Sequence, residues 1–239
     1  MDSQNILHGQ AALVTGASRG IGLAIARRLG SMGARVAVCA RDAHRLEQAA
    51  SAMRSEQIAV LPILADVSRS EDVTRMVAQV ERTWGPIDIV VNNAGIGVFR
   101  PGHEATEADW DSVLDTNLKA VFLICRAVAP GMIQHGGGHI INISSLAGKN
   151  AFPGGAVYCA SKWGLQGFSF CLAEDLRAHK IRVSVICPGS VSTDFGPHAG
   201  KDRGKMLQPE DVAHAVAALV TQAPQSFISE VLMRPTQKP

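Results

Sequence analysis

The sequence predicts an α/β fold, a doubly wound parallel β-sheet of about seven strands with helices on both faces. Three observations support this fold. Short apolar runs rich in valine and isoleucine alternate with helical patterns along the whole chain. These runs are apolar throughout rather than at every second position, as in strands with both faces buried. A glycine-rich turn joins the first strand to the first helix.

The individual elements follow from these patterns. The run 11–15 (AALVT) predicts a short buried strand, and runs such as 35–39 (RVAVC) predict the others. The expected strands are 11–15, 35–39, 58–64, 87–91, 139–143, 181–187 and 227–232. Helical patterns fill the gaps, at about 20–32, 43–55, 69–84, 106–134, 157–179 and 209–222. Because no repeat or linker divides the chain, residues 1–239 are expected to form a single domain.

The bulk composition is that of an ordinary globular protein. With 46% apolar residues and a net charge of +2, the chain gives no reason to expect a nucleic acid or an anionic membrane as partner. No run approaches the roughly 20 charge-free apolar residues of a membrane span, and residues 1–5 lack the features of a secretory signal. Five widely spaced cysteines predict reduced thiols in a cytoplasmic protein. The histidines show no ligand spacing, so no metal site is expected.

Gly16, Gly20 and Gly22 lie between the first strand and the first helix. In this setting a phosphate meets free backbone N–H groups and the positive end of a helix dipole. The spacing is Gly-x-x-x-Gly-x-Gly rather than the commoner dinucleotide fingerprint. The motif predicts a dinucleotide site, with a tight turn that binds nothing as the alternative.

Tyr158 and Lys162 are four residues apart in a predicted helix, so they lie on one face, one turn apart. The ammonium group of Lys162 stabilises a phenolate and is expected to lower the pKa of Tyr158 from its usual value of roughly 10. A phenol with a lowered pKa exchanges protons near neutral pH. The alternative is a chance pair on an exposed helix.

These two motifs and the landmarks between them resemble the short-chain dehydrogenase/reductase family, in its classical single-domain branch. Ser145 lies 13 residues before Tyr158, which is part of the matching pattern. The resemblance implies a Rossmann-type fold and a nicotinamide-dependent oxidoreductase acting on CH–OH groups. The landmarks are 15–22 (TGASRGIG), Asp66-Val67, 92–95 (NNAG), Asn117, Ser144-Ser145, Tyr158, Lys162 and Pro188-Gly189.

The resemblance also implies the catalytic roles. Tyr158 would act as general acid towards a carbonyl oxygen, and Lys162 would lower the tyrosine pKa and hold the nicotinamide ribose. Ser145 would hydrogen-bond the substrate oxygen where negative charge develops. Asn117 would anchor a water that relays protons to Lys162, with a helix-interior residue bonded to backbone as the alternative. The spacing selects Ser145 as the catalytic serine, and Ser144 is expected to be structural.

The cofactor contacts carry over in the same way. Asp66 and Val67 would hold the adenine, with a helix-capping role for Asp66 as the alternative. Residues 93–95 would lie along the adenosine ribose, and residues after Pro188 would line the nicotinamide carboxamide. The expected cofactor-binding residues are Gly16, Ser18, Arg19, Gly20, Ile21, Gly22, Arg41, Asp66, Val67, Asn93, Ala94, Gly95, Tyr158, Lys162, Pro188, Gly189, Val191 and Thr193.

The choice of cofactor depends on the end of the second strand. Ala40 stands where family members that prefer NAD carry an acid for the ribose 2′-OH. Arg41 follows, and Arg19 lies in the glycine turn, so two guanidinium groups are available for a 2′-phosphate. Asp42 is the counterargument, although it could instead cap the next helix. The sequence therefore predicts NADP(H).

The substrate is the least determined feature. Residues 190–208 are expected to form a short, glycine-rich segment that covers the cleft and is mobile until ligand binds. Its basic residues would favour an anionic substrate or a phosphopantetheine carrier, or simply form a solvated face. These basic residues are His198, Lys201, Arg203 and Lys205.

The expected activity is NADPH-dependent reduction of a ketone or aldehyde. Reduction of a 3-oxoacyl-[acyl-carrier-protein] or acyl-CoA is the alternative. Carrier-protein reductases of the family place basic residues before the fifth strand and after the long helix that follows it, where this chain has 136–138 (GGG) and His179-Lys180. A non-catalytic NADPH-binding sensor is a more distant alternative, because such relatives usually lose the tyrosine or the lysine.

The expected partners are a small carbonyl or alcohol substrate and further copies of the chain. The segments 106–134 and 157–179 contain broad apolar stripes, and the equivalent helices of the family pack against a second subunit. A homodimer or homotetramer is therefore implied by the resemblance. The alternative is that both stripes only face the sheet.

Overall fold

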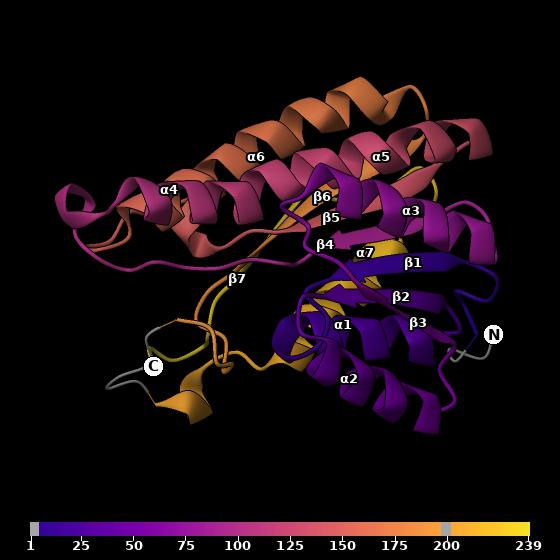
Figure 1. The fold of residues 1–239 in the computed structure, drawn as a ribbon, viewed down its shortest axis with the longest axis horizontal. Helices are drawn as coiled ribbons and strands as arrows, with labels where there is room; N and C mark the ends of the chain where they lie inside the picture. The colour runs from indigo at the N-terminus through magenta and orange to yellow at the C-terminus, as the bar shows by residue number, and fades with distance from the viewer. Residues whose placement is uncertain (1–4, 197–201) are drawn as a thin grey trace.

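The computed structural model describes residues 5–196 and 202–239, in which parallel strands form one seven-stranded sheet (Figure 1). The strand order is β3-β2-β1-β4-β5-β6-β7, so the predicted doubly wound fold is confirmed. The strands are β1 (Ala11–Thr15), β2 (Arg35–Ala40), β3 (Val60–Leu64), β4 (Ile89–Asn92), β5 (Gly138–Ile143), β6 (Ile181–Pro188) and β7 (Glu230–Met233).

Three strands begin later than predicted. The residues Ile58, Ile87 and Phe227 are apolar because they pack against the two cores, not because they belong to a strand. The ladder starts two or three residues further on, in β3, β4 and β7. The apolar runs therefore predict where each strand lies but not the residue at which its hydrogen bonding to the next strand begins.

Helices cover both faces of the sheet (Figure 1). Alternate strand residues face alternate sides, so Ala12 and Val14 join one apolar core while Leu13 joins the other. The first core is closed by α1 (Gly20–Ser31), α2 (Ala43–Ser55) and α7 (Pro209–Val220). The second core is closed by α3 (Ser70–Trp84), α5 (Ala120–His135) and α6 (Ala156–Arg177). Short 3₁₀ turns are η1 (Gly102–Glu104), η3 (Leu146–Gly148) and η4 (Arg203–Lys205).

The long helix predicted at 106–134 is interrupted. It consists of α4 (Glu107–Leu114), a π-helical turn η2 (Asp115–Lys119) and α5. Thr106 starts α4 through a capping box with Asp109. The π turn is centred on Asn117, whose side chain is bonded to residues outside the helix. Turns of this kind are frequent at functional sites.

The interrupted helix also has the length and apolar character of a membrane span. In the described part of the chain, Glu107–His135 alone is long and apolar enough to qualify, with a mean hydropathy of 1.3. Half of its most apolar stretch is buried inside the fold. In α5 the residues Val121, Ile124 and Val128 pack into the core beneath the sheet, as expected for a core helix.

Gly22 allows α1 to start against the ends of β1 and β4. A Cβ atom at this position would clash with the carbonyl oxygen of Gly16 and would lie 2.5 Å from Nδ2 of Asn93. We therefore predict that Gly22→Ala lowers the free energy of unfolding by about 1–3 kcal/mol, the usual effect of overpacking. Denaturant unfolding measures the change.

Gly167→Ala is the matched control for this variant. Gly167 lies in α6, where an added Cβ meets nothing within 4 Å. The substitution should raise the free energy of unfolding by about 0.5–1 kcal/mol, because alanine favours the helix. Equal effects of the two substitutions would contradict the packing role of Gly22.

His139 is a buried histidine at the start of β5. Its Nε2 is 2.9 Å from the Ser184 hydroxyl, and its Nδ1 has no hydrogen-bond partner among the described residues. Burial, aided by the positive charge of Arg182, lowers the pKa of His139 from 6.5 to about 3. The ring is therefore neutral in the folded protein.

We predict that this histidine destabilises the protein in acid. The unfolded chain takes up the proton near pH 6.5, whereas the folded protein does so only near pH 3, so stability falls as the pH drops between these values. His139→Asn should reduce the slope by up to about 1.4 kcal/mol per pH unit. Urea unfolding from pH 7 downwards measures the slope, and His214→Asn, on the exposed face of α7, is the control. Equal slopes for the two variants would refute the assignment.

Candidate active site

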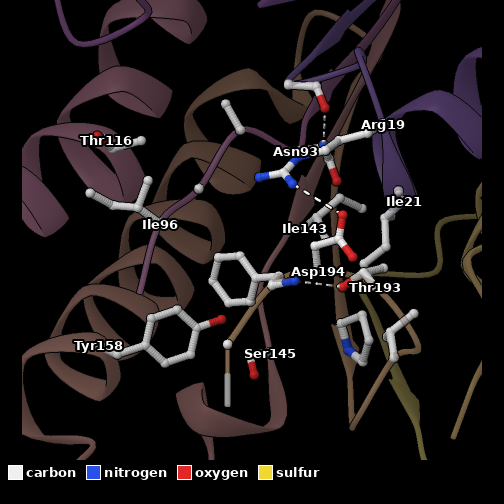
Figure 2. Close-up of a pocket in the computed structure, with 18 of the residues that line it drawn as sticks. Arg19, Ile21, Asn93, Ile96, Thr116, Ile143, Ser145, Tyr158, Thr193 and Asp194 are labelled. Atoms are coloured by element: carbon white, nitrogen blue, oxygen red, sulfur yellow. Dashed lines mark hydrogen bonds and ion pairs between the residues drawn. The ribbon is translucent and has the colours of Figure 1, made fainter. Parts of the chain in front are cut away.

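A cleft of about 1050 Å³ opens at the carboxyl ends of the strands. It crosses the point between β1 and β4, where the strand order reverses direction. In doubly wound sheets this switch point is where ligands bind. Figure 2 shows Tyr158 and Ser145 on one side of the pocket and Arg19, Ile21 and Asn93 on the other.

The ends of β1 and β4 are joined by a small set of hydrogen bonds. Oγ1 of Thr15 accepts from the backbone N–H groups of Asn93 and Ala94, each at 3.0 Å. Nδ2 of Asn93 donates to the carbonyl oxygens of Thr15 at 2.9 Å and Gly16 at 3.2 Å. Asn93 lines the cleft as predicted, but both of its donor contacts hold the fold together.

The glycine turn leaves the start of α1 open to the cleft. Gly16 and Gly20 have φ values of 63° and 55°, and a Cβ at Gly16 would lie 2.8 Å from the Cα of Ala94. Within the described structure, no side chain caps α1 at Arg19. The backbone N–H groups of its first turn therefore have no side-chain acceptor. Gly22 is buried behind the turn and outside the cleft lining, where it has a packing role, and its cofactor contact stays a prediction.

Charged side chains gather where β2 and β3 end. Nη1 of Arg41 lies 3.9 Å from a carboxylate oxygen of Asp66, whose other oxygen accepts from the N–H and hydroxyl of Ser68 at 3.0 and 2.7 Å. Asp42 accepts from the N–H of Arg45 at 3.0 Å, which confirms the capping alternative for this residue. Arg45 also lines the cleft and adds a guanidinium group that was not predicted from the sequence.

The segment after β6 forms another wall. Nη1 of Arg19 pairs with Asp194 at 3.2 Å across the mouth of the cleft (Figure 2). Arg203 donates to the Thr193 carbonyl oxygen at 3.3 Å, and Lys205 pairs with Asp202 at 3.4 Å.

Most of the predicted cofactor contacts fall on this lining. Within the predicted segment 190–208, residues 197–201 lie outside the described residues, so the expectations for His198 and Lys201 are not addressed. The remaining predicted cofactor residues on the cleft lining are Ser18, Ile21, Val67, Gly95, Pro188, Gly189 and Val191.

Ser145, Tyr158 and Lys162 meet at the inner end of the cleft. Ser145 precedes η3, while Tyr158 and Lys162 lie one turn apart near the start of α6. Ser145 Oγ accepts from the backbone N–H of Ala147 at 3.1 Å and lies near enough to the Tyr158 phenol to favour its ionised form. Nζ of Lys162 donates to the carbonyl oxygen of Ile143 at 2.9 Å and lies 5.9 Å from the centre of the Tyr158 ring. The three predicted side chains are therefore brought together.

The pKa of Tyr158 shifts in the direction opposite to the prediction. Burial raises the pKa of Tyr158 to about 12, and the hydrogen bond from Ser145 only partly offsets this rise. Burial also lowers the pKa of Lys162 from 10.5 to about 8. Removing both groups from water disfavours both charged forms, and burial is the largest cause of each shift. Near neutral pH the phenol therefore keeps its proton.

Asn117 lies behind the cleft rather than on its lining. Its Oδ1 accepts from the N–H of Ile96 at 2.8 Å, and its Nδ2 donates to the Ile96 carbonyl at 2.9 Å and to Ser161 Oγ at 3.0 Å. Ser161 donates in turn to the Tyr158 carbonyl oxygen at 2.7 Å. The side chain thus follows the alternative of a helix residue bonded to backbone, and it positions α6.

Ser144 has the structural role that was expected. It is buried, and its Oγ accepts from Nε2 of Gln166 at 3.2 Å, which ties the end of β5 to α6. Several residues of the site were not predicted from the sequence. Thr15 and Ser161 lie inside the recognised motifs and could have been found there, whereas the other residues follow no motif spacing. These others are Arg45, Phe99, Phe152 and Phe195.

Known proteins resemble this chain over nearly its whole length. Gluconate 5-dehydrogenase of Gluconobacter oxydans is 36% identical over 239 residues, covering 95% of this chain and 93% of that protein. A metagenomic short-chain oxidoreductase solved in complex with NADP is 48% identical, with a TM-score of 0.87, covering 98% of this chain and all of the other. A variant of actinorhodin polyketide ketoreductase solved with NADPH is 34% identical, with a TM-score of 0.88 and coverage of 94% and 95%.

The resemblance predicted from the motifs is confirmed by these relatives and by a family model. The model described as short chain dehydrogenase matches residues 10–204, which include the glycine turn, the joint between β1 and β4, and the Ser145–Tyr158–Lys162 cluster. The chain therefore belongs to the short-chain dehydrogenase family of oxidoreductases.

Proposed function

We propose that this protein is an NADPH-dependent reductase of ketones or aldehydes that also oxidises the corresponding alcohols. The observation that carries the proposal is the cluster of Ser145, Tyr158 and Lys162 at the inner end of a cleft whose other end is lined by glycines and arginines. Bound NADPH would supply the hydride, so a ketone, NADPH and one proton become a secondary alcohol and NADP⁺.

The chain's own groups supply the proton and hold the substrate. The hydroxyls of Ser145 and Tyr158 would both hydrogen-bond the carbonyl oxygen, where negative charge develops during reduction. Because burial raises the pKa of Tyr158 to about 12, the phenol is a proton donor throughout the neutral range. Tyr158 would give its proton to the oxygen and be reprotonated from solvent.

Lys162 and Asn117 would support this transfer. The pKa of Lys162, lowered by burial to about 8, suits a group that exchanges protons near neutral pH. Its bond to the Ile143 carbonyl fixes the ammonium beneath the tyrosine, where it would also hold the nicotinamide ribose. Since Ile96 and Ser161 take both N–H donors of the Asn117 side chain, a relay water would be held by its backbone carbonyl in the π turn.

The residues present fit a dinucleotide with a 2′-phosphate. The uncapped start of α1 suits the pyrophosphate, and close packing at Gly16 leaves no room for a Cβ. Ala40 offers no acid to the ribose, and the Asp42 carboxylate already caps α2. The arginines Arg41 and Arg45, with Arg19 opposite, would hold the 2′-phosphate. Similar structures solved with NADP and NADPH support this assignment.

We also propose that copies of this chain form a homo-oligomer in the cytoplasm. Large apolar side chains remain exposed on α4, α5 and α6, where the family resemblance places a second subunit. These side chains are Trp110, Phe122, Trp163 and Phe170.

Tyr158→Phe tests the proton donor. Because Tyr158 is the only tyrosine, the change removes one hydroxyl and no other phenol. We expect kcat for ketone reduction to fall by about 10²–10⁴-fold, the usual contribution of a general acid. NADPH binding, measured by fluorescence, should change little, and this is the control for folding. Retained turnover would exclude Tyr158 as the donor.

Arg41→Ala tests the cofactor assignment. Loss of one hydrogen-bonded guanidinium should raise KM for NADPH by about 10-fold or more and leave KM for NADH nearly unchanged. Arg54→Ala, on the exposed face of α2 in an ion pair with Glu47, is the matched control. An equal rise for both cofactors would show that Arg41 does not contact the 2′-phosphate.

A further inference from the structure

Three phenylalanines surround the catalytic tyrosine. The Tyr158 ring centre lies 5.4 Å from that of Phe99 and 5.8 Å from that of Phe195, and Phe152 lies 6.2 Å from Phe99. They come from the loop after β4, the loop before α6 and the segment after β6. Phe99, Phe152 and Phe195 are named here the aromatic wall. The chain has seven phenylalanines, so nearly half of them gather at this one place.

The backbone around the aromatic wall is shaped to hold the rings. A Cβ at Gly97 would lie 2.6 Å from the Phe99 ring, and a Cβ at Gly155 would lie 2.6 Å from the Phe152 ring. Larger residues at these glycines would push the rings out of place. The two rings therefore lie directly against backbone.

Part of the aromatic wall is open to a ligand. Phe152 and Phe195 are 42% and 39% exposed, and both line the cleft. Apolar surface of this kind, rimmed by polar residues in a cleft, is typical of a binding site for an apolar group. A ring placed beside Tyr158 would cover these faces and would stack against them edge-to-face or offset.

Among the described residues, no cation is directed at the aromatic wall. The cations that line it are bound elsewhere: Lys162 donates to Ile143 and Arg203 to the Thr193 carbonyl, and Arg19 pairs with Asp194. Arg41 and Arg45 lie at the dinucleotide end. Over residues 5–196 and 202–239, no cation lies over a ring of the aromatic wall. A carboxylate placed there would lose its water without gaining a partner.

We propose, building on the reductase function above, that the substrate is a neutral ketone or aldehyde carrying an aromatic or similarly bulky apolar group. The carbonyl oxygen meets Ser145 and Tyr158, and the apolar group covers Phe152 and Phe195. Sugar acids and 3-oxo acids are poor substrates, because their carboxylate meets this uncharged wall. The reaction remains transfer of a hydride from NADPH to the carbonyl carbon and of a proton to its oxygen.

Three ketones test the substrate class: phenylacetone, butanone and acetoacetate, each with NADPH. We expect kcat/KM for phenylacetone to exceed that for butanone by about 10-fold or more, and acetoacetate to be the poorest. Acetoacetate as the best substrate, or a phenyl group that gives no advantage, overturns the substrate class while the reductase stands. Absence of turnover with all three overturns the reductase function and this inference with it.

Substitutions locate the effect in the aromatic wall. Phe152→Ala and Phe195→Ala should each lower kcat/KM for phenylacetone about 10-fold more than for butanone. Ile6→Ala, 53% exposed and outside the cleft lining, is the control and should leave the ratio unchanged. Unchanged NADPH affinity shows that a variant is folded. An unchanged ratio in both wall variants overturns the placement of the apolar group.

Discussion

The hydroxyl of Thr15 is the contact on which the cleft depends. After β1 the chain builds one half of the sheet, with β2 and β3, and it then crosses to the other side of β1 to form β4. The segments that follow β1 and β4 therefore run in opposite directions, and the crevice lies between them. One oxygen accepts from the N–H groups of both Asn93 and Ala94 at the point of parting. This hydroxyl holds together the turn that contains Gly16 and the loop that leads to Phe99. These two segments line the two ends of the cleft. A buried N–H left without this acceptor would cost about 1–3 kcal/mol.

Burial controls the chemistry of the inner end of the cleft. In water a tyrosine and a lysine lose their protons at nearly the same pH, but here the pKa of Tyr158 is about 12 and that of Lys162 about 8. The lysine therefore becomes neutral long before the tyrosine ionises. The low dielectric of the packed cleft therefore makes Tyr158 a firm proton donor and Lys162 a group that titrates near neutral pH.

Local patterns were enough to predict the sheet, the glycine turn and the shared helix face of Tyr158 and Lys162, because each depends on residues close together in the chain. The pKa of Tyr158 was predicted in the wrong direction, because desolvation is a property of the packed cleft. The π turn was missed because it depends on bonds from Asn117 to Ile96 and Ser161, far along the chain. Arg45 and the aromatic wall were missed for the same reason: no periodic pattern brings their segments together.

A chain whose only tyrosine is its proposed proton donor has an optical probe at the site of reaction. Every tyrosinate absorbance band, every phenol resonance after isotope labelling and every product of tyrosine nitration reports on one position. In most proteins such signals are averages over many phenols. Here the ionisation, exposure and hydrogen bonding of Tyr158 are measurable without a substitution that would disturb the cleft.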